Sequence, residues 1–356
     1  MASKDLTHFK EEQYSQDEQE AISEEENKCK QLILSLPKEI GSGNECLYFY
    51  QSFWIPKSII PTTISFQNHF QAKDSDVVVA SMPKSGTTWL KALAFAIVNR
   101  QKFSLENHPL LTLNSHELVP HFEVNVYVDT MFQLPNTNRS NMIEPRIFAT
   151  HVPYPSLAKS VKDSNCRIIY ICRNPFDTYV SYWNFMKKLI PNDQDLPTLT
   201  IEEDFEKYCK GICYYGPFWD NILGYLKESI ARPNKVLFLK YEELKENANF
   251  HVKRIGEFLG CPFTQEEESN GMIENIVKLC SFEKMKELET NKFGTFYFLE
   301  KNKCGTIEQR VEKKHLFRKA EIGDWVNSFS PSMVEKLSKV MEEKLSGVDL
   351  SFKVYP

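Results

Sequence analysis

A run of three valines that leads through a glycine turn into an apolar helix constrains this fold more than any other feature. The run Asp76-Val-Val-Val-Ala80 is continuous and mostly β-branched, as in a strand that is buried on both faces of its sheet. Pro83–Thr88 follows as a turn, and Trp89–Val98 has the mostly apolar composition of a buried helix. A strand, a turn and a helix in this order are typical of a parallel α/β sheet.

Three further short apolar runs are candidates for the other strands of the sheet: residues 146–151, 166–172 and 235–240. Pro175 suits the first turn of a helix that begins near Phe176, and a later helix is expected around Asn249–Leu259. The alternation predicts an α/β fold with a central, mostly parallel sheet and helices on both of its faces. Ligands of such sheets bind at the C-terminal ends of the strands, which is where the conspicuous polar residues of this chain lie.

The first part of the chain differs in composition from the rest. Residues 1–30 hold nine acids and four lysines, so this segment carries the whole net charge of −5 and the remainder is neutral. Because the segment is nearly free of large apolar side chains, its composition predicts disorder. We therefore expect a disordered acidic tail over residues 1–44 and a single domain over residues 45–356.

The composition also bears on partners and location. The neutral remainder of the chain provides no broad basic field for nucleic acid. The N-terminus lacks the apolar segment of a signal peptide, and stretches such as Ala92–Val98 are far short of the ~20 residues of a membrane span. We expect a cytoplasmic protein that binds neither nucleic acid nor membranes. The cysteines and histidines show no zinc spacing, so no metal is expected.

The segment Ser81–Trp89 has the features of an anion-binding loop. Gly86 frees the backbone to curl around an anion, hydroxyls and the N-terminal amides of the following helix are donors, and Lys84 adds a full charge. The order differs from the nucleotide-triphosphate pattern GxxxxGK[ST], because here the lysine precedes the glycine. The alternative is a helix cap rich in serine and threonine, which leaves Lys84 unexplained.

Three separated motifs resemble those of the cytosolic sulfotransferases, in the same order along the chain. They are Pro83-Lys-Ser-Gly-Thr-Thr-Trp89, Arg173-Asn-Pro-Phe-Asp-Thr-Tyr-Val-Ser181 and Arg318-Lys-Ala-Glu-Ile-Gly-Asp-Trp325. Stretches such as Tyr50–Trp54, Tyr214–Trp219 and Leu237–Glu242 look most like the plant branch. The resemblance covers roughly residues 45–356. It implies the P-loop-kinase-like sulfotransferase fold and transfer of a sulfuryl group from 3′-phosphoadenosine 5′-phosphosulfate (PAPS) to the hydroxyl of a small organic acceptor.

The resemblance also implies a set of residues that bind PAPS. These are Lys84, Ser85, Gly86, Thr87, Thr88, Trp89, Arg173, Ser181, Tyr241, Ser281, Phe282, Arg318, Lys319 and Ala320. Residues 85–88 would bind the 5′-phosphate, Arg173, Ser181 and the flap at 318–319 the 3′-phosphate, and Trp89 and Phe282 the adenine. Taken alone, the two aromatic residues are equally compatible with core packing. Ser181 alone is an ordinary helix serine, and the basic run at 313–319 an ordinary solvated face.

His151 and Lys84 are the expected catalytic residues. His151 ends a strand, as Arg173 does, so the two should meet at one edge of the sheet. The resemblance makes His151 the base and places Lys84 on the bridging oxygen between phosphate and sulfate. Two positions depart from the family pattern. Ala149 replaces a lysine of animal members, and Ala320 replaces a glycine, which costs about 1 kcal/mol if that position needs a positive φ.

The acceptor site is expected to consist of aromatic residues near the same edge. The candidates are Phe53, Trp54, Tyr154, Tyr182, Trp183 and Phe185. The resemblance allows flavonols, other phenols, hydroxylated jasmonates, steroids and desulfo-glucosinolates, and the sequence does not choose among them. It also allows a homodimer, although no clean match to the family's short dimerisation motif precedes the C-terminal segment.

Two other functions remain open on the sequence alone. A P-loop kinase shares the strand, loop and helix, but it needs a lysine after the glycine and a carboxylate that holds magnesium. A nucleotide-binding protein that has lost catalysis is favoured only by Ala320, whereas Lys84, His151, Arg173 and Ser181 are all present.

Overall fold

The computed structural model describes residues 16–42, 45–127, 143–189, 199–298 and 309–355. Its centre is a sheet of four parallel strands: β4 (Val77–Ser81), β5 (Ile147–Thr150), β6 (Arg167–Cys172) and β7 (Val236–Lys240). The strand order is β5-β4-β6-β7, and Val79 pairs with Ala149 on one side and Ile169 on the other. The predicted strands and the parallel α/β fold are confirmed.

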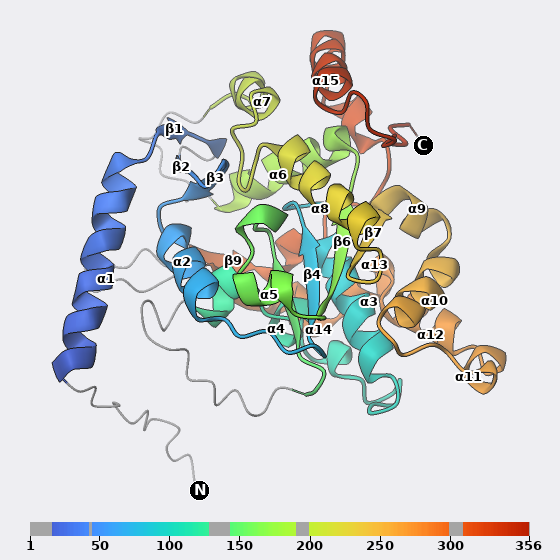
Figure 1. Ribbon diagram of the computed structural model, residues 1–356. Coiled ribbons are helices and arrows are strands. Elements are labelled where there is room, and N and C mark those ends of the chain that lie inside the picture. Colours follow the sequence, from blue (N-terminus) through green and yellow to red (C-terminus); the bar gives the residue numbers. More distant parts are fainter. Residues whose placement is uncertain (1–15, 43–44, 128–142, 190–198, 299–308, 356) are drawn as a thin grey trace, which may run out of the picture.

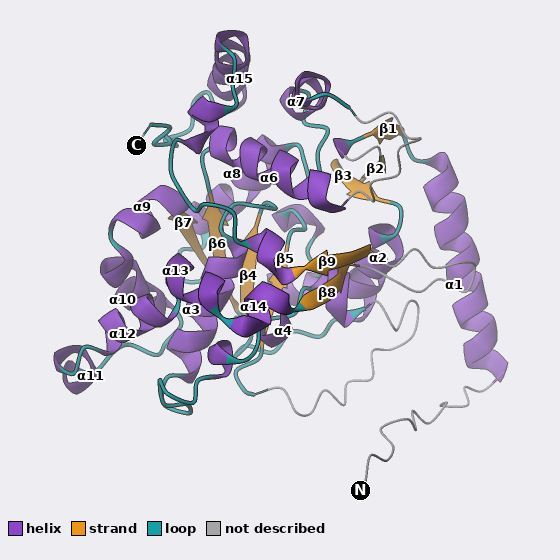
Figure 2. Cartoon of the chain, turned by 180° about the vertical axis from the view of Figure 1, so that it is seen from behind, coloured by secondary structure: helices purple, strands orange, loops and turns teal. Residues whose placement is uncertain are grey.

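The sheet is buried on both faces, which explains why its strands are apolar without alternation. Val77 and Val79 face one apolar core, whereas Val78 and Ala80 face the other. Helices cover both faces, as the views from the two sides show (Figures 1 and 2).

Different helices form the two layers. The core of Val77 and Val79 includes side chains from α3 (Thr87–Asn99), α9 (Tyr241–Glu246), α10 (Ala248–Phe258), α12 (Met272–Leu279) and α13 (Phe282–Glu287). The core of Val78 and Ala80 includes side chains from α2 (Ile59–His69), α5 (Lys159–Asp163), α6 (Pro175–Leu189), α7 (Ile201–Cys209), α8 (Phe218–Ala231) and α15 (Pro331–Lys344).

Shorter elements complete the described part of the chain. Three short helices are α4 (Ser115–Leu118), α11 (Gln265–Ser269) and α14 (Glu289–Phe293). An antiparallel sheet contains β1 (Lys38–Ile40), β2 (Cys46–Tyr50) and β3 (Phe53–Pro56), and β8 (Thr295–Phe298) pairs with β9 (Gln309–Glu312).

The N-terminal segment is more ordered than its composition predicts. Residues Gln16–Ser35 form helix α1 at the side of the molecule (Figure 1). Cys29 and Ile33, four residues apart and therefore on one face of the helix, are buried in the core that also contains Tyr50. A narrow apolar stripe therefore gives this acidic helix a contact with the core, which the composition of the segment did not indicate. Residues 1–15 lie outside the described residues, and the single domain over residues 45–356 stays a prediction.

Parallel strands bring four chain segments to one edge of the central sheet. The register aligns Ser81 with Ile171 and Cys172 with Lys240, so β4, β6 and β7 end close together. The residues that follow β5, β6 and β7 are His151, Arg173 and Tyr241. The sheet therefore presents the predicted polar residues at its C-terminal edge, as expected for this class of fold.

Candidate active site

The loop between β4 and α3 is shaped as an anion cradle. Gly86 has a φ of +108° and precedes the first residue of α3, Thr87. A Cβ atom at Gly86 would lie 2.9 Å from Cδ2 of Tyr241, so both the conformation and the packing require glycine there. The hydroxyls of Ser81 and Thr87 share a hydrogen bond of 2.6 Å across the loop. The first N–H groups of α3 have no acceptor within the helix. They lie at the positive end of the helix dipole and are available to an anion bound in the loop.

Lys84 brings a cation into this loop from a restrained backbone. It has a φ of +67°, in the left-handed region that non-glycine residues rarely adopt. Its Nζ atom lies 3.9 Å from the centre of the Phe185 ring. Burial, and then the charges of Arg318 and Arg173, lower the pKa of Lys84 to about 7. An anion bound beside these three cations would restore the charge of the lysine.

His151 is held as a neutral imidazole with a free lone pair. Its Nδ1–H donates to the carbonyl of Ser81 at 2.7 Å, which leaves Nε2 as the acceptor. Its backbone N–H donates to Oε1 of the buried Glu123 at 2.7 Å, and the Thr150 hydroxyl donates to the other oxygen at 3.0 Å. Burial is the main cause that lowers the pKa of His151 to about 3. Because Ser81 opens the anion loop, this bond ties the imidazole directly to the cradle.

Arg173 provides a buried guanidinium at the end of β6. It contacts the carbonyl of Glu321, lies 3.5 Å from the Asp177 carboxylate, and stacks with Cζ 4.6 Å from the centre of the Tyr241 ring. The Nε atoms of Arg173 and Arg318 are buried and have no hydrogen-bond partner among the described residues. Two unpaired guanidinium donors in one region fit a phosphate, which accepts several hydrogen bonds at once.

Helix α6 ties the C-terminal segment to this region. The Asp177 carboxylate accepts from the amides of Gly323 and Trp325 at 2.8 and 3.1 Å. Ser181 lies one turn farther along α6 and is 8% exposed. The Asp177 carboxylate therefore joins α6, which contains Ser181, to the C-terminal segment that contains Arg318 and Lys319.

The basic pair of the C-terminal segment is engaged by a carboxylate. Arg318 and Lys319 both form ion pairs with Asp324. Ala320 has a φ of +58°, the conformation that glycine adopts at least cost, and its carbonyl accepts from the Tyr241 hydroxyl at 3.1 Å. Position 320 therefore does require a positive φ, and the cost of about 1 kcal/mol expected for alanine in place of glycine applies.

The residues predicted to hold adenine are placed less uniformly. The ring of Trp89 meets Tyr241 edge to face with centroids 5.6 Å apart, and its buried indole N–H has no partner among the described residues. Phe282 packs against Phe317 with ring centroids 6.2 Å apart. Ser281 accepts a hydrogen bond from the amide of Lys284 at 3.2 Å and so caps α13. Ser281 thus has a structural role that its motif did not indicate.

The predicted acceptor residues are not all gathered at His151. Phe185 lies beside Lys84, and Phe53 stacks on Tyr215, whose ring centre is 5.2 Å from that of His151. Tyr154 instead packs on Tyr225 of α8. Sequence reasoning missed Tyr215, although it lies within the Tyr214–Trp219 motif.

Three further residues near His151 were also missed: Lys91, His116 and His121. Lys91 is completely buried, and the His121 ring centre lies 4.7 Å from that of His151. A lysine in an apolar helix gives no sequence signal of burial, because lysine is nearly always exposed.

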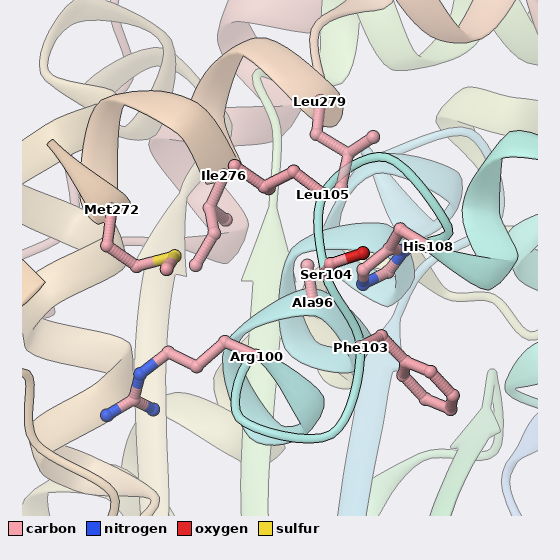
Figure 3. Close-up of a pocket in the computed structure, with 9 residues that line it drawn as sticks. All are labelled: Ala96, Arg100, Phe103, Ser104, Leu105, His108, Met272, Ile276 and Leu279. Atoms are coloured by element: carbon pink, nitrogen blue, oxygen red, sulfur yellow. The ribbon is translucent and has the colours of Figure 1, made fainter.

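A cavity of about 240 Å³ lies at the other end of α3, away from the anion loop (Figure 3). Its lining residues are Ala96, Arg100, Phe103, Ser104, Leu105, His108, Met272, Ile276 and Leu279. It shares no residue with the candidate site.

Comparison with known proteins decides the family. The family model described as "Sulfotransferase domain" matches residues 74–349, which include the anion loop, His151, Arg173 and the C-terminal segment. The chain belongs to the sulfotransferase family. The enzyme class and the family resemblance predicted from the motifs are thereby confirmed.

Relatives of this sulfotransferase come from a plant. Arabidopsis thaliana cytosolic sulfotransferase 13 is 46% identical over 332 residues, which cover 93% of this chain and 95% of the relative. Cytosolic sulfotransferase 15 of the same organism is 43% identical over 328 residues, or 91% and 87% of the two chains. These matches confirm the likeness to the plant branch, and the relatives' names agree with the expected cytosolic location.

Solved structures with the same fold include a plant and an animal enzyme. An Arabidopsis thaliana sulphotransferase is 40% identical with a TM-score of 0.68, covering 91% of this chain and 94% of that one. A mouse sulfotransferase complexed with PAP is 25% identical with a TM-score of 0.59, covering 85% and 95%. No described helix of this sulfotransferase combines the length and apolar character needed to cross a membrane.

Proposed function

We propose that this sulfotransferase transfers the sulfuryl group of PAPS in line to the hydroxyl of a small organic acceptor, with His151 as the base. The hydrogen bond from Nδ1 of His151 to the Ser81 carbonyl carries the proposal. It leaves the Nε2 lone pair for a substrate proton and fixes the imidazole to the loop that holds Lys84. The imidazole is neutral, which is the form that can take a proton, and the negative charge of a phosphosulfate bound beside it would raise its lowered pKa.

The residues around the site fit a nucleotide with phosphates at both ends. Residues 85–88 would bind the 5′-phosphate with amides and hydroxyls, and the orphan Nε atoms of Arg173 and Arg318 would bind the 3′-phosphate together with Ser181 and Lys319. Trp89 and Tyr241 would both contact the adenosine. The mouse relative complexed with PAP supports a bisphosphate nucleotide.

The chemistry requires a base, a cation and alignment. Nε2 of His151 takes the proton of the acceptor hydroxyl while the acceptor oxygen forms a bond to sulfur. The bond between sulfur and the bridging oxygen breaks, and its electron pair leaves with the 5′-phosphate. Lys84 stabilises the charge that develops on that oxygen, and the loop amides hold the phosphate in line. No metal is needed in this scheme, since Lys84, Arg173 and Arg318 meet the charge of the leaving group.

The acceptor would lie against an aromatic wall beside His151. Phe53, Tyr215 and Phe185 are the described aromatic residues that the contacts connect to His151 or Lys84. Such a wall suits an acceptor with a large apolar surface, such as a flavonol or another phenol, a hydroxyjasmonate or a steroid-like alcohol. A homodimer stays a prediction.

Transfer of radiolabelled sulfate from PAPS to a panel of phenols, hydroxyjasmonates and steroids tests the proposal. We expect label in at least one product without added metal. Binding of adenosine 3′,5′-bisphosphate without transfer to any acceptor would instead support a homologue that has lost catalysis, which the strained Ala320 favours. Magnesium-dependent hydrolysis of ATP would support the P-loop kinase.

A further inference from the structure

A buried lysine lies behind the candidate base and contacts two histidines. Lys91 belongs to α3 and is 0% exposed. Its Nζ atom lies 2.9 Å from Nδ1 of His121 and 3.2 Å from Nδ1 of His116. His121 is fixed there by a backbone bridge to Ala149 of β5, two residues before His151. The three residues form one polar cluster between the anion loop and the base.

The donors and acceptors of this cluster determine the tautomers of both rings. A lysine ammonium has three hydrogens and no lone pair, so both Nδ1 atoms must accept from it. With the lysine charged, Nε2 of His116 and Nε2 of His121 therefore carry the ring hydrogen. Burial lowers the pKa of Lys91, and the nearby Glu123 carboxylate opposes that effect.

The His116 branch leads to the anion loop. Nε2 of His116 lies 3.0 Å from the Thr88 hydroxyl oxygen. With its hydrogen on Nε2, the imidazole donates to that oxygen, and the hydroxyl hydrogen of Thr88 is left for another acceptor. Thr88 is in the first turn of α3, where the 5′-phosphate is expected.

The His121 branch leads to the reacting centre. His121 is 2% exposed, and its Nε2 has no hydrogen-bond partner among the described residues. Its ring lies 4.7 Å from that of His151 at an angle of 37°. A buried N–H without an acceptor is costly, so its presence next to the base indicates an acceptor that arrives with the substrates.

We propose that Lys91 is a positioning residue for sulfuryl transfer that acts through these two histidines. Through His116 it directs the Thr88 hydroxyl to the nucleotide, and through His121 it directs an N–H group to the oxygen atoms at the reacting centre. This role rests on the proposed function. The histidines deliver the two contacts, and the lysine fixes their direction.

Three variants separate the two branches by nucleotide affinity and turnover. Thr88→Val should raise the Kd of adenosine 3′,5′-bisphosphate about tenfold, because a hydrogen bond to a charged group is lost. His121→Phe should lower kcat about tenfold and leave this Kd within about twofold. Lys91→Met should do both, and combining it with Thr88→Val should raise Kd no further than Thr88→Val alone.

A matched control removes another buried polar side chain from the same helix. Asn99→Ala at the far end of α3 should change neither Kd nor kcat, although it also removes a buried hydrogen bond. Circular dichroism and thermal unfolding show whether each variant is folded. If Lys91→Met does not fold, Thr88→Val and His121→Phe still test one branch each, and wild-type values for both would overturn the proposal.

NMR spectra of protein with ¹⁵N-labelled histidines test the effect of Lys91 on the two rings independently of activity. We expect the Nε2–H tautomer for His116 and His121 in the wild type, and changed shifts for both in Lys91→Met. The proposal would be overturned if the ¹⁵N shifts of both rings were unchanged in Lys91→Met. It would also be overturned if the double variant had a Kd raised by the product of the two single effects. A wild-type protein that binds no nucleotide would refute the proposed function, whereas the tautomers would still report whether Lys91 directs the rings.

Discussion

The two ends of the proposed nucleotide site are built in different ways. The 5′ end is a single local segment, Ser81–Trp89. Its loop is shaped by the positive φ of Gly86, by the start of helix α3 and by the hydrogen bond between the hydroxyls of Ser81 and Thr87. The 3′ end is assembled from two distant parts of the chain: the segment from the end of β6 into helix α6, and residues 318–320. Its cations already have protein partners, since Arg318 and Lys319 pair with Asp324.

Because of this difference, we expect the two ends to contribute differently to turnover and to nucleotide affinity. A loop that is shaped before the ligand arrives can stabilise charge in the transition state without reorganisation. Cations that must exchange a carboxylate for a phosphate contribute affinity, reduced by the ion pairs that they give up. We therefore expect loss of the Lys84 cation at the 5′ end to act mainly on turnover, and changes at the 3′ end to act mainly on binding.

Lys84→Met should produce the largest effect and test the role of the 5′ end. Without the cation beside the bridging oxygen, kcat should fall by about 10² to 10³. The Kd of adenosine 3′,5′-bisphosphate should change much less, because the loop amides remain. Single-turnover kinetics and calorimetry measure the two quantities. A Kd that rises as much as kcat falls would show that the Lys84 cation contributes binding and not turnover.

Arg173→Met should show the opposite pattern at the 3′ end. Loss of the buried guanidinium should raise Kd by about a hundredfold, since charge-assisted bonds to a phosphate are strong. At saturating PAPS, kcat should stay within a few fold of the wild type. Calorimetry with steady-state kinetics checks this, and a large fall in kcat at saturation would contradict the assignment.

The pH dependence of binding should separate the two ends without mutation. Lys84 has its pKa lowered to about 7 by burial, Arg318 and Arg173, and the bound phosphate favours its charged form. Above pH 7 binding must therefore take up a proton, and the Kd of adenosine 3′,5′-bisphosphate should rise by up to about tenfold in total, the limit being the effect of losing the Lys84 charge. Arginine stays charged throughout, so adenosine 3′-phosphate should show little of this rise. Equal pH profiles for the two ligands would contradict the prediction.

Ala320→Gly should have the smallest effect, and it tests whether backbone strain weakens the 3′ end. Glycine relieves the cost of a φ of +58°, so we expect about 1 kcal/mol of added stability and up to about a fivefold lower Kd. Ala248→Gly is the matched control, because this residue begins α10 without a positive φ and should lose stability. Thermal unfolding and calorimetry give both values, and an unchanged or weakened Ala320→Gly protein would show that strain is not the cause.

The sheet and the 5′ end were predictable because their information is local. The valine run, the turn and the helix are contiguous, and burial on both faces leaves a continuous apolar pattern. Helix α1 was not predicted, because its docking depends on Cys29 and Ile33 meeting a core made of later residues. Composition describes the polar majority of such a helix and not its narrow contact face.

The candidate site was predictable where a motif names its residues, and much less so elsewhere. The positive φ of Ala320 was anticipated only as a condition, since backbone conformation follows from the surrounding contacts. Lys91, His116 and His121 were missed because the chain brings together positions about 30 residues apart. The ring centre of Tyr215 lies 5.2 Å from that of His151 although the two residues belong to separate motifs, and no local pattern gives that distance.

The most direct measurement compares wild type and His151→Ala for nucleotide binding and for transfer. The account predicts that both proteins bind adenosine 3′,5′-bisphosphate with the same Kd in calorimetry. Only the wild type should transfer label from PAPS to an acceptor, because removal of the imidazole leaves no base beside Lys84. Full turnover by His151→Ala, or no binding by the wild type, would contradict it.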